Sequence, residues 1–361
     1  MIDLTKRFSF GVNLDDYWRY AGTKAPKSII IPHLLTVALP DTSFRQDLGK
    51  TVSGVPSIEA ANLTLTKTLS NAKVDYVRCW FPWNLFEPTI TPVELLDQLL
   101  ETSYPRWPMD PLVTALTSHG ISIVPVLASG YHRMLPKGLR VDQNPELYIK
   151  RASIHTRLLV RRYKDRIKSW QIENEPNWWI RHFAAGWRSG LSWLRLPGFR
   201  ERLLQALHDS VRAEDPQSKI IVNLEGDARH LDPLKYARFC DILGLDFYPN
   251  YEVSSPINLS IFRISSKVGK EAGRPVIISE TGYPSGPRIL GHSRRKQAEY
   301  VRRSCREAFH IDTVNGVGMW RYADSAWKSF PFQENYFGLM DSNGNPKPSW
   351  GEYSDVILNL K

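Results

Sequence analysis

The chain has 361 residues, of which 42% are hydrophobic and 23% are charged. This balance excludes a disordered chain and a small disulfide-stabilised scaffold. Lysine and arginine together number 47 against 37 aspartates and glutamates, which gives a formal net charge of +10. The basic residues are scattered, as in Arg294-Arg295-Lys296, and are not gathered with base-stacking aromatic side chains, so we expect no nucleic-acid partner.

The cysteines and the amino terminus bear on the compartment. Cys79, Cys240 and Cys305 are odd in number and far apart in sequence, so they form neither a fully paired disulfide framework nor a zinc-binding spacing. The first residues lack the apolar block of a signal peptide, and no run of about 18 apolar residues occurs. We therefore expect a cytoplasmic protein, with a trimmed export signal as the alternative.

Short apolar runs alternate with longer amphipathic stretches along the chain. The apolar runs predict strands at Phe8–Asn13, Tyr76–Cys79, Ile121–Leu127, Ile167–Ile172, Ile220–Leu224, Ile242–Phe247, Val276–Ser279 and Val317–Trp320. The stretches between them predict helices at Ser57–Ala72, Pro111–His119, Pro145–Tyr163, Phe199–Glu214, Leu234–Phe239, Ile261–Ala272 and Ser293–His310, and a last one after Trp350. Near-continuous apolar strands are typical of a parallel sheet that is covered on both faces.

Eight strand–helix units predict a single closed (β/α)8 TIM barrel, and a doubly wound open sheet is the alternative. No linker and no break in composition divides the chain, so we expect one domain over residues 1–361. Three predicted loops after strands are long, at residues 15–56, 128–144 and 177–197. In a barrel such loops lie at the catalytic face and shape the substrate cleft.

Two glutamates stand where predicted strands end. The fourth strand ends in WQIENEP (residues 170–176), which contains Glu175, and the seventh ends in ISETGYP (residues 278–284), which contains Glu280. Hydrolysis of a glycosidic bond needs two carboxyl groups across the scissile oxygen, and a separation of about 5–5.5 Å gives retention of configuration. Strand ends on opposite sides of a barrel supply such a pair, whereas the structural alternative is a salt bridge at the rim.

These motifs resemble the acid/base and nucleophile motifs of clan A of the glycoside hydrolases, which are retaining (β/α)8 enzymes. The run from Trp170 to Glu175 is similar to family 42 β-galactosidases, and its Asn-Glu-Pro-Asn continuation is similar to families 5 and 39. The Glu-Thr-Gly-Tyr-Pro-Ser run that begins at Glu280 resembles the family 17 β-1,3-glucanases. The order and spacing of the motifs match from Phe8 to Trp350, and the family within the clan stays open.

The resemblance implies catalytic roles for the two glutamates. Glu175 would be the general acid and then the general base, and Glu280 would be the nucleophile that forms a covalent glycosyl-enzyme. Asn174 would hydrogen-bond the 2-hydroxyl of the sugar. Arg78, which matches the usual arginine of the clan at the end of strand two, would keep Glu280 ionised and oriented.

The resemblance also implies positions that contact the sugar or the nucleophile. Tyr248 matches the tyrosine of strand six that hydrogen-bonds the nucleophile. Trp320 matches the aromatic floor under the sugar that is cleaved. His132, after strand three, falls where some members of the clan place a substrate-binding residue; its structural alternative is a hydrogen-bonded rim residue.

Glu173 lies two residues before Glu175 in the fourth-strand motif. If the strand persists that far, period-two alternation puts both glutamates on the same side of the sheet. Glu173 is then an alternative acid, or a neighbour whose like charge favours the protonated form of Glu175. The motif favours Glu175, and a salt bridge is the structural alternative for Glu173.

The fourth loop is rich in tryptophan and arginine, beginning with Trp178 and Trp179. Three interpretations stay open. The loop forms a helix that packs an aromatic stripe on the barrel, or it presents sugar platforms such as Trp178 at leaving-group subsites. In the third interpretation it is a lip in peripheral contact with an anionic membrane, which would fit a glycolipid substrate.

The sequence as a whole predicts a retaining β-glycosidase that acts on a β-linked oligosaccharide, glycoside or glycolipid. We expect no metal and no cofactor, because no ligand cluster, phosphate-binding glycine loop or dinucleotide fingerprint occurs. One alternative is a transglycosylase that passes the same covalent intermediate to a sugar acceptor. Another is a catalytically idle glycan-binding barrel, whose signature would be the loss of one carboxylate. The sequence leaves the sugar, exo or endo action and the oligomeric state open.

Overall fold

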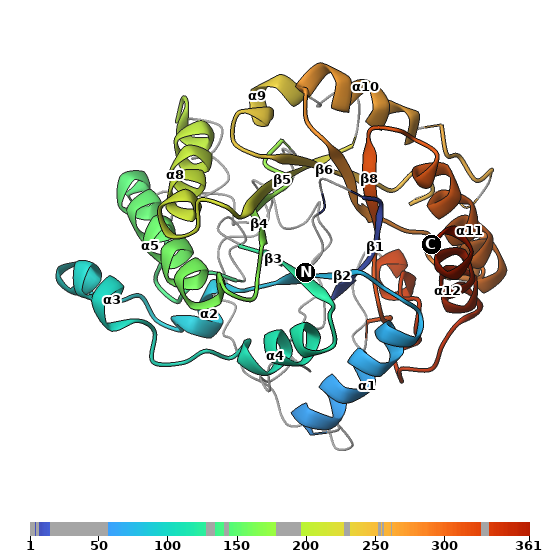
Figure 1. The fold of residues 1–361 in the computed structure, drawn as a ribbon, viewed down its shortest axis with the longest axis horizontal. Coiled ribbons are helices and arrows are strands. Elements are labelled where there is room, and N and C mark those ends of the chain that lie inside the picture. Colours follow the sequence, from blue (N-terminus) through green and yellow to red (C-terminus); the bar gives the residue numbers. More distant parts are fainter. Residues whose placement is uncertain are drawn as a thin grey trace.

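Parallel strands close into a barrel in the order of the sequence, from β1 to β8, as the ring of strands in Figure 1 shows. The strands are β1 Ser9–Leu14, β2 Tyr76–Trp80, β3 Ser122–Val126, β4 Ser169–Asn174, β5 Lys219–Glu225, β6 Ile242–Phe247, β7 Val276–Thr281 and β8 Val314–Met319. Because β1 pairs with both β2 and β8, the sheet has no edge. The predicted (β/α)8 barrel is confirmed, and the doubly wound open sheet is excluded.

The structure is a computed structural model that describes residues 4, 7–14, 57–127, 134–140, 144–177, 196–226, 232–251, 254, 256–260, 262–325 and 332–361. Within these ranges no helix is long and apolar enough to cross a membrane. Cys79, Cys240 and Cys305 are buried and form no disulfide with one another. That residues 1–361 form a single domain stays a prediction.

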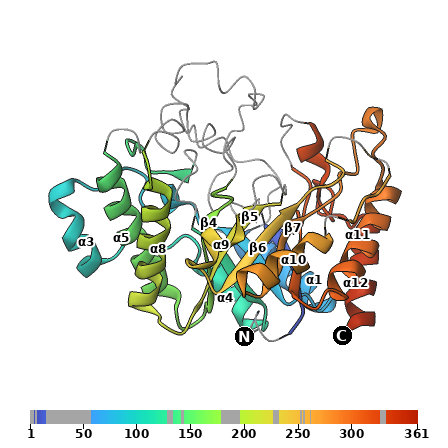
Figure 2. The ribbon, with the colours of Figure 1, turned by 90° about the horizontal axis from the view of Figure 1, so that it is seen from above.

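Helices surround the barrel, and Figure 2 shows the longer ones standing beside the strands. They are α1 Ile58–Asn71, α2 Trp83–Phe86, α3 Leu96–Thr102, α4 Asp110–Ser118, α5 Pro145–Tyr163, α8 Phe199–Glu214, α9 Pro233–Ala237, α10 Phe262–Ala272, α11 Arg294–Phe309 and α12 Pro348–Leu360. Sequence analysis did not predict the short helices α2 and α3. The other helices agree with the predicted ones to within about two residues, apart from α12, which begins at Pro348 rather than after Trp350.

Polar side chains begin several of these helices. The side-chain oxygens of Ser57, Asn144 and Ser293 accept hydrogen bonds from backbone N–H groups in the first turns of α1, α5 and α11. Such a cap satisfies a donor that the helix leaves unpaired. In α5 the cap is followed by Pro145, whose fixed φ angle suits the first helical position. These local signals explain why the helix starts were predictable.

Each strand alternates between the helix layer and the barrel interior. In β2, Val77 and Cys79 belong to the large core between strands and helices, whereas Tyr76 lies inside the barrel. The interior apolar cluster consists of Leu4, Tyr76, Val124, Ile221, Ile242 and Ile277. Two residues further along β2, Arg78 occupies the next inward position, and it is 1% exposed. An apolar layer therefore supports a polar layer nearer the carboxyl ends of the strands.

Gly244 in β6 allows this polar layer to close. A Cβ atom at this position would lie 2.6 Å from both Asn223 Cβ and Ser279 Oγ. We predict that Gly244→Ala destabilises the protein by about 1–3 kcal/mol through overpacking, measured by urea denaturation. Gly351→Ala in α12 is the control: its added Cβ meets nothing within 4 Å, so helix propensity should make it neutral or stabilising. Equal stability of the two variants would contradict the close packing at Gly244.

Candidate active site

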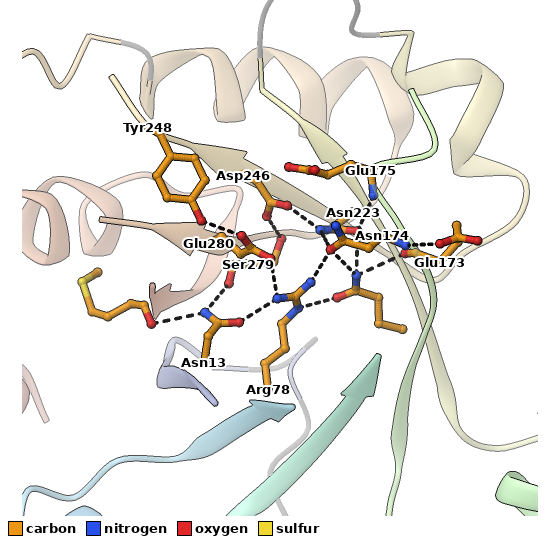
Figure 3. A network of polar contacts seen from close by, with 12 residues as sticks. Asn13, Arg78, Glu173, Asn174, Glu175, Asn223, Asp246, Tyr248, Ser279 and Glu280 are labelled. Atoms are coloured by element: carbon orange, nitrogen blue, oxygen red, sulfur yellow. Dashed lines mark hydrogen bonds and ion pairs between the residues drawn. The ribbon is translucent and has the colours of Figure 1, made fainter. Parts of the chain in front are cut away.

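A network of polar side chains from most strands of the barrel meets near the carboxyl ends of the strands (Figure 3). Its members are Asn13 (β1), Arg78 (β2), Gln171 and Asn174 (β4), Asn223 (β5), Asp246 (β6), and Ser279 and Glu280 (β7). Each of these residues is at most 6% exposed. In (β/α)8 barrels this end of the sheet carries the active site, so the network is the candidate active site.

Glu280 is held at both carboxylate oxygens. Arg78 Nη1 donates to Oε1 at 2.5 Å, and the hydroxyl of Tyr248 donates to Oε2 at 2.5 Å. Burial by itself lowers the pKa of Arg78, but the opposing effects, first among them the charge of Glu280, outweigh it and raise that pKa, so the guanidinium stays charged. Burial and the charge of Glu280 also raise the pKa of Tyr248 well above its usual range, which keeps its hydroxyl a donor. The two donors fix the orientation of the carboxylate.

The same guanidinium fixes the orientation of the amides around it. Arg78 can only donate, so the atoms that face it must be oxygens. They are Gln171 Oε1 at 2.6 Å, Asn13 Oδ1 at 2.7 Å, and Asn174 Oδ1. The amide nitrogen of Asn174 therefore lies on the side away from the arginine. The nitrogen of Gln171 is placed to donate, and it does so to Asn223 Oδ1 at 2.6 Å.

Asn13 links the network to two further strands. Its Nδ2 donates to the backbone carbonyls of Ser279 at 3.0 Å and Met319 at 3.2 Å, while its oxygen accepts from Arg78. The side chain is 1% exposed, so these bonds satisfy polar atoms that water cannot reach. Asn13 thus ties the arginine to the ends of β7 and β8.

Glu173 lies in β4 next to a bulge, whereas Glu175 follows the end of that strand. The register with β5 shifts between Gln171 and Glu173, and the strand ends at Asn174. The Glu173 carboxylate accepts from the backbone N–H of Asn174 at 2.9 Å, and Figure 3 shows it pointing away from Glu280. The expectation that Glu173 and Glu175 share a side required the strand to persist to Glu175; because β4 ends at Asn174, the period-two alternation does not reach Glu175.

Glu175 directly follows β4 in an unusual backbone conformation. Its φ angle is 48°, in the left-handed region that L-residues rarely adopt. Its N–H lies between two acceptors of Asn223, the side-chain Oδ1 at 3.0 Å and the backbone carbonyl at 3.1 Å. Figure 3 shows its carboxylate directed over the network toward Asp246. Strained residues of this kind cluster at functional sites, where the surrounding structure holds them.

Asp246 is the second carboxyl group that the network buries, beside Glu280. Ser279 Oγ donates to its Oδ1 at 2.6 Å, and Asn223 Nδ2 donates to its Oδ2 at 2.5 Å. Burial, followed by the negative charges of Glu280 and Glu175, raises the pKa of Asp246 well above its usual range. Both glutamates are therefore electrostatic neighbours of the same buried carboxyl, which places them at one site.

An aromatic cluster flanks Glu280. The rings of Tyr248 and Phe337 are edge to face with centroids 5.6 Å apart, and Tyr251 stacks on Phe337 at 5.8 Å. The hydroxyl of Tyr251 donates to Glu334 Oε1 at 2.8 Å. This cluster packs the ring of Tyr248 in the position from which its hydroxyl reaches the carboxylate of Glu280.

The remaining predicted site residues divide into two groups. Trp320 directly follows β8 and is half-buried. Its backbone N–H donates to the backbone carbonyl of Thr281, the residue after Glu280, at 2.7 Å. It therefore lies at the same rim, and its role as a sugar platform stays a prediction. His132 and Trp178 lie outside the described residues. Among the described residues, no group of three histidine, cysteine, aspartate or glutamate side chains is placed to hold a metal ion.

Sequence reasoning missed five members of the network: Asn13, Gln171, Asn223, Asp246 and Ser279. Each one interrupts an otherwise apolar strand near its carboxyl end, and that interruption was the available signal. Which of them face inward depends on strand register and on bulges. The register between β6 and β7, for example, shifts so that Asp246 pairs with Glu280 while Ser279 also reaches it.

Replacing Arg78 should expose the cost of the buried charge. In Arg78→Met the Glu280 carboxylate keeps its burial but loses its cation, and a broken buried pair of this kind costs about 3–5 kcal/mol of folding free energy. Urea denaturation measures the loss. The control is Arg303→Met, which breaks the exposed pair with Glu299 and should change stability by less than about 1 kcal/mol. Equal losses would show that the Arg78–Glu280 pair carries no special energy.

Searches among family models and among curated proteins found no match to this chain. Among solved structures, the chain is similar to a β-glucosidase from Thermotoga maritima, with a TM-score of 0.66, 16% identity and 98% coverage of both chains. It is similar to a GH5_18 protein from Bifidobacterium longum subsp. longum, with a TM-score of 0.66, 16% identity, and coverage of 98% of this chain and 79% of that one.

A third similar structure is a GH2 β-galacturonidase from Eisenbergiella tayi, with a TM-score of 0.57 and 14% identity. The match covers 84% of this chain, which spans 48% of the length of that protein. At these identities the likeness shows the fold. The chain therefore shares the (β/α)8 barrel fold of these glycoside hydrolase structures.

Proposed function

We propose that this protein is a retaining β-glycosidase in which Glu280 is the nucleophile and Glu175 is the general acid and base. The observation that carries the proposal is the fixed carboxylate of Glu280, bound by Arg78 and Tyr248. Glu175 is the second carboxyl group at the same site, as the mechanism requires. The motifs WQIENEP and ISETGYP support the same two residues.

In the first step, an oxygen of Glu280 attacks the anomeric carbon while Glu175 gives its proton to the glycosidic oxygen, and the carbon–oxygen bond to the leaving group breaks. In the second step, ionised Glu175 takes a proton from water, whose oxygen attacks the anomeric carbon. The ester bond to Glu280 breaks, and the sugar leaves with its original β configuration. Both carboxyl groups return to their starting states, so the cycle consumes only water.

Neighbouring side chains assist these steps. The nitrogen of Asn174 lies away from Arg78, because the arginine holds the oxygen of that amide. In this orientation the nitrogen donates to the 2-hydroxyl of the bound sugar. Trp320 supplies an apolar platform at the rim, and Arg78 balances the charge that Glu280 carries before attack and regains after hydrolysis.

The substrate class that fits best is a β-linked pyranoside. The fold neighbours include a β-glucosidase, an exo-β-1,4-mannosidase and GH5_18 proteins in complexes with Manβ1-4GlcNAc. Gluco- and manno-configured β-glycosides are therefore the first substrates to test. Water and a hydroxyl group of a second sugar are both competent acceptors for the intermediate, so transglycosylation is measured alongside hydrolysis.

The test is hydrolysis of a panel of aryl β-glycosides and β-linked disaccharides by the wild type and by Glu280→Gln. We expect the wild type to cleave at least one gluco- or manno-configured substrate and the variant to be inactive on it. Equal cleavage by both proteins would contradict the role of Glu280. Binding of oligosaccharides without any cleavage by the wild type would favour the idle glycan-binding barrel.

A further inference from the structure

Asp246 stands beside the two proposed catalytic glutamates, and the two-step reaction does not use it. It pairs in register with Glu280 across β6 and β7 and is 2% exposed. Two neutral groups, the hydroxyl of Ser279 and the amide of Asn223, donate hydrogen bonds to it. A buried carboxylate without a bonded cation is expensive, and a neighbouring negative charge makes it more so.

Arg78, the cation of the site, is hydrogen-bonded to groups other than Asp246. Arg78 donates to Glu280, Asn13, Gln171 and Asn174, and within the described residues it is the one cation bonded into the network. Its charge balances one carboxylate, that of Glu280. An ionised Asp246 would add negative charge that no bonded cation offsets.

We propose that Asp246 is a positioning residue that stays protonated in the resting enzyme, with its proton on Oδ1 toward Ser279, and that it holds Glu175 in place through Asn223. The part that concerns Glu175 rests on the proposed function. The protonation state follows from the burial of Asp246 and its partners and is independent of that function.

The hydrogen-bond directions allow only one place for the proton. Arg78 fixes the oxygen of Gln171, so the nitrogen of Gln171 faces Asn223 Oδ1, and Asn223 Nδ2 must face Asp246 Oδ2. That oxygen is therefore an acceptor. Asp246 Oδ1 faces the Ser279 hydroxyl, which donates to the ionised carboxyl but can rotate to accept from the protonated one, so the proton of the neutral form lies on Oδ1.

The link to Glu175 runs through one side chain. Asn223 Nδ2 donates to Asp246 Oδ2 and to Asn174 Oδ1, and Asn223 Oδ1 accepts from the backbone N–H of Glu175 as well as from Gln171. Asp246 therefore helps to fix the rotation of the amide that holds Glu175 at its left-handed φ angle of 48°. A neutral Asp246 does this without adding charge as the negative charge passes from Glu280 to Glu175 during the reaction.

Some of the charged and titratable groups around Asp246 raise its pKa and others lower it. Glu280 from β7 and Glu175 after β4 raise its pKa in addition to burial, while Arg78 from β2 and the Ser279 hydroxyl lower it. Glu225 of β5 pairs in register with Asp246. Tyr248, directly after β6, and Tyr76 of β2 are close enough to interact electrostatically with Asp246. Their net effect is to raise the pKa of Asp246 well above its usual range, which favours the protonated form.

The first experiment is the infrared difference spectrum between wild type and Asp246→Asn at neutral pH. We expect the variant to lose one C=O band of a protonated carboxyl group. Asp97→Asn is the control, because Asp97 is an exposed carboxylate paired with Lys150, and its loss removes carboxylate bands instead. Loss of carboxylate bands in Asp246→Asn would overturn the proposal. If this variant does not fold, Ser279→Ala replaces it, and the protonated C=O band should shift because its acceptor is gone.

The second experiment measures the role in positioning through the pH profile of kcat/KM. Asp246→Ala removes one of the two acceptors of Asn223 Nδ2 and leaves only Asn174 Oδ1 at 2.8 Å, and we expect about tenfold lower kcat/KM than in Asp246→Asn, which keeps both hydrogen bonds of Asp246. In Asp246→Asn the acidic and basic limbs of the pH profile should keep the pH midpoints of the wild type. If Asp246 were ionised, removing its charge would move both limbs to lower pH, which would overturn the proposal. Because the infrared result needs no turnover, failure of the proposed function would be recognised separately.

Discussion

Glu280→Ala is expected to lower kcat/KM for an aryl β-glycoside by about 10⁴-fold or more and to produce an α-glycosyl azide when azide is added. Alanine removes the attacking oxygen but keeps the space that the carboxylate occupied. Azide enters that space and attacks the anomeric carbon from the same face. The glycosyl azide therefore forms with a single inversion. Initial rates give the loss of activity, and proton NMR of the product gives the configuration.

Glu299→Ala, on the exposed face of α11, is the control and should match the wild type with and without azide. A β-configured azide from Glu280→Ala would assign this residue to the acid side of the reaction. Full activity of the variant would remove Glu280 from the chemistry altogether.

Glu175→Ala is expected to show a loss that depends on the leaving group. General acid catalysis contributes about 10²–10⁴-fold, so the variant should lose this much on alkyl glycosides or disaccharides. On a dinitrophenyl glycoside, whose leaving group needs no proton, formation of the glycosyl-enzyme should be nearly unaffected. Azide should then intercept the intermediate and give a β-glycosyl azide, because two inversions have occurred. Rates on a series of aryl leaving groups and NMR of the azide product measure both effects.

Glu173→Gln is the matched control for the acid, since it changes the neighbouring carboxyl of the same motif. Its carboxylate points away from Glu280, so its rates should show no added dependence on the leaving group. If Glu173→Gln showed that dependence and Glu175→Ala did not, the acid would be Glu173 and the motif assignment would be wrong.

The elements that the sequence predicted best are those with local signals at their ends. Helix α5, Pro145–Tyr163, was predicted to the residue, because an asparagine cap and a proline mark its start. Strand β6, Ile242–Phe247, was also predicted to the residue from its apolar run. The start of β8 was missed, because Asn315 and Gly316 interrupt its apolar pattern although the strand begins at Val314 and Gly316 pairs with Ile277 of β7.

In the candidate site, too, the residues that stand in local motifs were predicted and the residues that orient them were not. Glu175, Glu280, Arg78 and Tyr248 stand in recognisable motifs at strand ends, and the structure places them at one mouth of the barrel. The partners that orient them depend on contacts between strands far apart in sequence. Asn13, for instance, contacts Arg78 and the carbonyl of Ser279, which is 266 positions away along the chain. Such contacts follow from barrel closure and bulges, for which the sequence holds no local signal.

The proposed mechanism requires a covalent bond between the sugar and Glu280. A 2-deoxy-2-fluoro-β-glycosyl fluoride of a sugar that the enzyme hydrolyses tests it, because the fluorine at C2 slows both steps while the fluoride leaving group restores the first. Mass spectrometry of peptides from the inactivated protein then locates the adduct. We expect one sugar on the peptide that contains Glu280. An adduct on Glu173 or Glu175, or turnover of the probe without any adduct, would contradict it.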